Sequence, residues 1–226
     1  MQIRSVRLLL LGALFGFYFG SLWLGSLHFP HGYDWRRYVI SRLLSPRDNP
    51  GWYWLPAAGV ALAGLCMLPL AAWTEAALGD AATPLARRVR RPAFLLGICC
   101  LSLSAIIVPQ HTHTVLGLRH AHELLARTSA AGLGIGMICA CQSPALAAPE
   151  RRLLRLLWRA ATLLPIIGAI GSGLIVALAH LHGVNPAAYF RGTIFWRLAF
   201  WEWAGSFSVF VFFAAPVLLL RDRSTR

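Results

Sequence analysis

The sequence contains no lysine and few charged residues of any kind, and these absences limit the class of protein. Charged residues make up 13% of the 226-residue chain and only eight of them are Asp or Glu, whereas 58% of all residues are hydrophobic. An average soluble domain carries about 25% charged residues. With a mean hydropathy of +0.61, the chain is too apolar for an ordinary soluble domain, so its composition indicates an integral membrane protein.

Acidic residues are scarce beside 21 basic ones, and the formal net charge is +13. Every basic side chain is Arg, and the arginines lie in clusters between long apolar runs rather than on one polar face. This placement is typical of residues that orient membrane helices, so we expect no nucleic-acid partner. The exclusive use of Arg favours a GC-rich bacterial genome and an inner-membrane location.

The polar segments also lack cysteine, which excludes a disulfide framework. All five cysteines fall inside apolar runs: Cys66, Cys99, Cys100, Cys139 and Cys141. Buried free cysteine usually behaves as a small hydrophobic residue. We therefore interpret these side chains as packing residues rather than as ligands for a soft metal.

Long apolar runs dominate the rest of the sequence and predict an all-α protein of one domain. A helix needs about 20 apolar residues to cross the hydrocarbon core. Six runs meet this length, and we expect membrane helices near 7–27, 54–73, 93–109, 121–146, 160–180 and 198–220. In the first connecting loop, Trp35 and Tyr38 alternate with arginines, which predicts a short amphipathic helix on the membrane surface.

The distribution of arginines between the loops predicts the orientation. The amino terminus, the second and fourth loops and the tail carry 13 Arg, whereas the other three loops carry six. Because loops that stay in the cytoplasm hold the excess of positive charge, both termini should be cytoplasmic. All eight histidines then fall on the outer side: His28, His31, His111, His113, His120, His122, His180 and His182.

Two of the expected helices carry ionisable residues. Successive helical residues turn by about 100°, so His120, Glu123 and Arg127 should share one face of the fourth helix. Arg197 opens the sixth helix, and Glu202 lies about one turn deeper. Ionisable groups inside a membrane usually face the bundle interior and mark a functional site. We expect Glu202 to lie opposite the stripe on the fourth helix.

These residues favour an outward-facing polar site that binds or modifies a membrane lipid. On this hypothesis the candidate catalytic residues act as general acid and base, and Arg127 or Arg197 holds a phosphate. The candidates are His120, His122, Glu123, Arg127 and Glu202. No cofactor is required.

Two alternatives remain open from the sequence. His111, His113, His120 and His122 could bind Zn or Cu, because imidazole is a common ligand of both, although no His-Glu-x-x-His motif occurs. Alternatively, Glu123 with Arg127 and Glu202 with Arg197 could be packing pairs. The protein would then be a non-catalytic partner, a sensor or a subunit of a homo-oligomer.

The order of several short motifs resembles a known family. A Tyr and an Ile-Ser pair stand in the first loop (Tyr33, Ile40, Ser41), and a Pro-containing stretch at 50–63 leads into the second helix. A His opens the fourth helix, at His120 or His122, and "WEWAGSFSVFVFFAAPVLLLRD" stands near the end. Together these features resemble the DRAM/FGF-receptor-activating-protein family, including a similar bacterial family of unknown function.

This resemblance implies six membrane helices with both termini cytoplasmic. Some eukaryotic members are associated with lipid remodelling of glycosylphosphatidylinositol anchors, and others with autophagy or lipid distribution. Carried over by position, the resemblance favours an outer-side cluster of His120 or His122, Glu202, Trp203 and Ser41. Ser41, Arg197 and Trp203 are accordingly the expected substrate-binding residues. The extra histidines and Arg127 depart from the family pattern.

Overall fold

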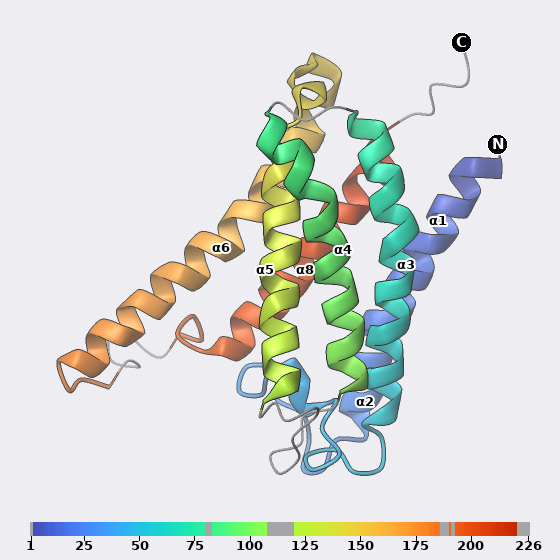
Figure 1. Ribbon diagram of the computed structural model, residues 1–226. Coiled ribbons are helices and arrows are strands. Elements are labelled where there is room, and N and C mark those ends of the chain that lie inside the picture. The colour runs from blue at the N-terminus through green and yellow to red at the C-terminus, as the bar shows by residue number, and fades with distance from the viewer. Residues whose placement is uncertain (1, 80–82, 108–119, 186–189, 191–192, 221–226) are drawn as a thin grey trace.

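The computed structural model describes residues 2–79, 83–107, 120–185, 190 and 193–220, and this part of the chain is helical without a strand (Figure 1). Six helices in it are long and apolar enough to cross a membrane, which confirms the predicted all-α, six-helix class. They span Arg4–Leu27, Trp54–Leu78 (α3), Pro84–Ile106 (α4), Ala121–Cys141 (α5), Pro149–Leu181 and Leu198–Leu219 (α8). Within the fifth span, α6 covers Arg152–Leu181.

The first span is not a uniform α-helix. It comprises α1 (Gln2–Phe15), a π-helical segment at Gly16–Gly20 and α2 (Ser21–Leu27). A π-helical turn contains more residues than an α-helical turn, and such turns are often found at functional sites. Tyr18 lies in the middle of this segment and is buried.

Three boundaries differ from the sequence prediction, each for a local reason. The α4 helix begins at Pro84 instead of near residue 93, because the Thr83 hydroxyl caps it by accepting a hydrogen bond from the Ala86 N–H at 3.1 Å. The α5 helix ends at Cys141 instead of 146, because Pro144 forces Ser143 into an extended conformation. The α6 helix begins at Arg152, since an arginine-rich turn can be helical outside the apolar run.

The loop between the first two spans also differs from expectation. Apart from a 3₁₀ turn at Ile40–Arg42, residues 28–53 form turns, so the predicted amphipathic surface helix is wrong. Side chains hold the turns together. The Tyr33 hydroxyl donates to the Tyr38 carbonyl at 2.9 Å, and the buried Asn49 amide donates to the Leu43 carbonyl at 3.2 Å.

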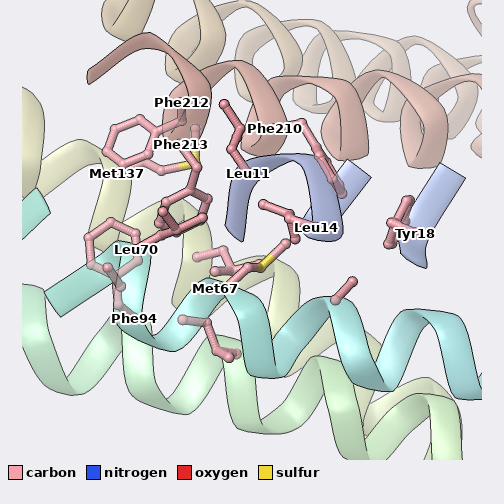
Figure 2. Packing of buried hydrophobic residues seen from close by; sticks show 14 of the residues in the cluster. Leu11, Leu14, Tyr18, Met67, Leu70, Phe94, Met137, Phe210, Phe212 and Phe213 are labelled. Carbon is pink, nitrogen blue, oxygen red and sulfur yellow. The ribbon is translucent and has the colours of Figure 1, made fainter. Parts of the chain in front are cut away.

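A cluster of buried apolar side chains joins all the spans except the lower part of α6 (Figure 2). Lipid tails are as apolar as these side chains, so inside a membrane the cluster stabilises the bundle through close packing. The labelled members are Leu11, Leu14, Tyr18, Met67, Leu70, Phe94, Met137, Phe210, Phe212 and Phe213.

Glycines bring α4 and α5 into backbone contact. A Cβ on Gly132 would lie 2.8 Å from the Ala93 carbonyl oxygen, and one on Gly97 would lie 2.6 Å from the Leu133 nitrogen. Such distances are too short for any side chain. Small residues at these positions therefore allow the two helices to approach closely, as in many membrane helix pairs.

A proline in α8 is compensated by a tryptophan from α6. Pro216 has no N–H, so the carbonyl of Phe212 one turn earlier cannot form its helical hydrogen bond. The indole N–H of Trp158 donates to this carbonyl at 2.8 Å, and the Trp158 side chain is fully buried. The bond satisfies a polar group that would otherwise be unpaired in the apolar core.

The α6 helix leans away from α5 toward the lower left of Figure 1. Its lower half is supported by the start of α8. The Trp201 ring packs against Gly168, where a Cβ would come too close to the ring, and the Ser172 hydroxyl donates to the Phe195 carbonyl at 2.7 Å. The rest of α6 exposes apolar side chains, as expected of a surface that contacts lipid.

Candidate functional site

The predicted stripe on the fourth membrane helix forms a self-contained ionic group at the start of α5. Arg127 donates a hydrogen bond to the Glu123 carboxylate, and His120 Nδ1 lies 3.7 Å from the same carboxylate. All three side chains are more than half exposed, at 69% for His120, 51% for Glu123 and 76% for Arg127. The three residues thus share a face and pair with one another.

His122 is held apart from this stripe by the end of α4. Its Nδ1 lies 2.7 Å from the Ser104 carbonyl oxygen and 3.2 Å from that of Ile107. Both partners are acceptors, so Nδ1 carries the proton and only Nε2 is left to accept one or to bind a metal. His122 therefore ties the start of α5 to the end of α4.

The predicted metal site has no further support in the described residues. His111 and His113 lie outside them, and within them no group of three or more His, Cys, Asp or Glu side chains could hold a metal ion. In the first loop, His28 stacks on Trp52 with ring centroids 3.8 Å apart. The Zn or Cu site remains a prediction of the sequence.

Glu202, one turn inside α8, joins that helix to the first loop. Its Oε2 accepts a hydrogen bond from the Ile40 backbone N–H at 2.7 Å. The described polar contacts of Glu202 lead to the first loop and the first span, and none in the described part of the chain leads to Glu123. The stripe on α5 and the Glu202 region are thus two separate polar groups.

A chain of hydrogen bonds connects Glu202 to the π-helical segment. The Ser206 hydroxyl donates to the Glu202 carbonyl at 2.8 Å, so the Tyr18 hydroxyl, 2.7 Å from Ser206 Oγ, donates to Ser206. The buried Tyr18 ring also packs on Phe210 of α8, with centroids 4.8 Å apart. The π-helical turn thereby fixes the first span against the polar start of α8.

The motif residues of the first loop gather around this region. Ser41 follows Ile40 in the 3₁₀ turn, and Tyr33 lies beside Trp203. The Trp203 indole N–H is buried close to the Tyr33 hydroxyl but outside hydrogen-bonding geometry. Burial, and to a smaller extent the charge of Glu202, raises the pKa of Tyr33, which is therefore a neutral hydrogen-bond donor at physiological pH.

A pocket of about 380 Å³ lies where the first loop meets the start of α8. Its lining residues are Arg37, Val39, Trp196, Arg197, Leu198 and Ala199. The two guanidinium groups are oriented by their neighbours. Arg37 Nε lies 3.3 Å from an Asp34 carboxylate oxygen, and Arg197 Nη1 donates to the Arg36 carbonyl at 3.3 Å.

The chemistry of this pocket suits an anion with an apolar part. No side chain caps the start of α8, so the first-turn N–H groups and the positive end of the helix dipole face this region. Arginine suits phosphate because its planar donors bind two oxygens at once. Val39 and Leu198 add apolar surface, and Leu198 is 66% exposed.

Sequence reasoning identified Glu202, Arg197, Trp203 and Ser41 in this region but missed Tyr18 and Arg37 as contributors. The signal for Tyr18 was present, because "GFYFG" places a polar hydroxyl between two glycines inside an apolar run. Arg37 could not be distinguished from its neighbours, since the pocket depends on how the first loop folds over α8.

The geometry thus shows a membrane-type helical bundle with a basic pocket and a buried polar network at the start of α8. Comparisons of the chain with protein-family models, with curated proteins and with solved structures find no match.

Proposed function

We propose that the protein binds the phosphate-bearing headgroup of a membrane lipid in the pocket at the start of α8. The single observation that carries the proposal is the pairing of Arg37 and Arg197 around a cavity of about 380 Å³ at the end of a membrane-spanning helix. Two guanidinium groups offer several donors to the phosphate oxygens. The uncapped first turn of α8 adds favourable electrostatics.

The position of the pocket favours a lipid over a soluble anion. Trp196 lines it and lies under the Arg197 guanidinium, 5.0 Å from the ring centroid, and tryptophan prefers the level of the lipid headgroups. The neighbouring Phe195 and Leu198 are exposed at the bundle surface, where acyl chains can contact them. In the orientation expected from the arginine distribution, the pocket opens on the outer side of the inner membrane.

Glu202 acts in this proposal as a positioning residue. By holding the Ile40 N–H, it fixes the adjacent Val39 in the pocket wall and the first loop against α8. The resemblance of Tyr33, Ile40, Ser41, Glu202 and Trp203 to the lipid-related DRAM/FGF-receptor-activating-protein family supports the same region as the functional one. Covalent chemistry at the headgroup is not needed to account for these contacts.

Photocrosslinking tests the proposal directly. The protein would be purified in dodecyl maltoside, which contains no phosphate, and titrated with a phospholipid that carries a diazirine on its headgroup. Mass spectrometry should map crosslinks to peptides that contain Val39 or Ala199. Because one basic residue near a lipid surface contributes about 1 kcal/mol, Arg197→Gln and Arg37→Gln should each lower the crosslinking affinity about fivefold.

Arg47→Gln is the matched control, because it removes the same charge from an exposed position in the first loop that does not line the pocket. It should leave the affinity unchanged. Arg197→Lys should restore part of the affinity, since it keeps the charge but loses the planar donors. Equal losses for Arg47→Gln and Arg197→Gln, or crosslinks confined to other peptides, would contradict the proposal.

A further inference from the structure

A second polar cavity lies between α5 and α6 at the opposite end of the bundle, the upper end in Figure 1. It measures about 200 Å³. Its lining residues are Ile138, Cys141, Gln142, Arg159, Thr162 and Leu163. It therefore opens where α5 ends and the second and third turns of α6 pass.

Arg159 differs from the neighbouring arginines in being uncommitted. Arg151 donates to the Ala77 carbonyl at 3.4 Å and Arg155 to the Leu146 carbonyl at 3.2 Å, so both hold the connecting loop in place. Within the described part of the chain, Arg159 makes no hydrogen bond or ion pair, and it is exposed at the cavity. The fold does not require its charge at this position.

The other lining residues make the cavity polar on one side and apolar on the other. The Cys141 thiol and the Thr162 hydroxyl are 3.6 Å apart and partner each other, while the exposed Gln142 amide is available at the rim. Ile138 and Leu163 are 39% and 46% exposed and face the surroundings of the helices. This arrangement matches a molecule with a polar head and an apolar tail.

We propose that this cavity binds the phosphate of an anionic phospholipid in the leaflet at the upper end of the bundle, with Arg159 as the cationic contact and Ile138 and Leu163 against an acyl chain. Basic pockets between membrane helices recognise anionic headgroups in this way. The arginine distribution predicts that this leaflet is the cytoplasmic one.

Arg159 is decisive because the helix end alone disfavours an anion. The last carbonyls of α5 give this end of the helix a partial negative charge. Gln142 uses its backbone N–H to satisfy the Ala140 and Cys139 carbonyls, but the dipole of the helix remains. An anion held beside the α5 terminus therefore depends on the guanidinium group of Arg159. The site is independent of the pocket at the start of α8.

The test uses the purified full-length protein in dodecyl maltoside and phosphatidylglycerol with a headgroup diazirine. Crosslinks should map to peptides containing Gln142 or Leu163, and Arg159→Gln should lower the affinity at these peptides about fivefold. Arg152→Gln is the matched control, since Arg152 is exposed on the same helix and does not line the cavity. It should change the affinity less than twofold.

A second variant makes the test independent of any folding defect in Arg159→Gln. Gln142→Trp, from an exposed position, fills the cavity without removing charge and should lower the same affinity. Losses of equal size for Arg152→Gln and Arg159→Gln, or full affinity in Gln142→Trp, would overturn the proposal. Competition by millimolar inorganic phosphate would overturn the assignment to a lipid. Arg197→Gln should leave these crosslinks intact, which separates this site from the other.

Discussion

Replacing Glu202 with Ala should release the first loop from α8. The structure gives Glu202 Oε2 one short hydrogen bond, 2.7 Å from the Ile40 nitrogen, in a partly buried position. A hydrogen bond to a charged group contributes about 1.5–3 kcal/mol. Opening of the loop at Ile40 should therefore become easier by that amount, which corresponds to a factor of about 10 to 150 in its opening equilibrium.

Hydrogen exchange of the Ile40 amide measures this opening. In Glu202→Ala the Ile40 amide should exchange about 10 to 150 times faster, whereas Glu202→Gln keeps an acceptor oxygen and should show a smaller increase. The Asn49 amide, which donates to the Ser45 carbonyl at 2.8 Å, serves as an internal reference in the same loop and should keep its rate.

Ser206→Ala is the matched control on α8. It removes the hydroxyl between Tyr18 and the Glu202 carbonyl but leaves the Glu202 carboxylate and Ile40 in place. If Ile40 exchanged at the same rate in Glu202→Ala as in the unaltered protein, the carboxylate would not hold the loop. The positioning role assigned to Glu202 would then be refuted.

Two further predictions concern packing within the bundle. Trp158→Phe should lower the free energy of unfolding by about 1–3 kcal/mol, because the Phe212 carbonyl loses its donor, and the loss should shrink in a Pro216→Ala background, where residue 216 regains an N–H; equal losses in both backgrounds would contradict this account. Gly132→Ala should destabilise the bundle by about 1–3 kcal/mol, whereas Gly134→Ala, whose new Cβ meets nothing closer than 3.9 Å, should not, and unfolding in mixed micelles compares the two.

The six spans could be predicted from the sequence because hydrophobic length alone determines which helices can cross a bilayer. The ends of the helices could not, because they depend on local features that hydropathy does not register. The Thr83 cap and the arginine-rich first turns of α6 extend their helices beyond the apolar run. Conversely, Pro144 ends α5 inside a run that continues to be apolar.

The candidate site was predictable only in its parts. Helical spacing correctly placed His120, Glu123 and Arg127 together, because that relation is local. The partner of Glu202 is a backbone N–H in a loop 162 residues away, and no side chain in the sequence marks it. Interactions that join distant segments through the backbone require the folded arrangement to be known.

The π-helical turn at Gly16–Gly20 makes the length of the first span a constraint on two separate contacts. Each residue turns a helix by about 100°, so one residue more or fewer changes the direction of everything that follows. Before and within this turn, Tyr18 points to α8, whereas beyond it Ser21 packs on Gly59 and Gly25 packs on Pro56 of α3. A deletion or insertion in the turn would break one of these alignments, so single-residue length changes should be tolerated in the loops but not here.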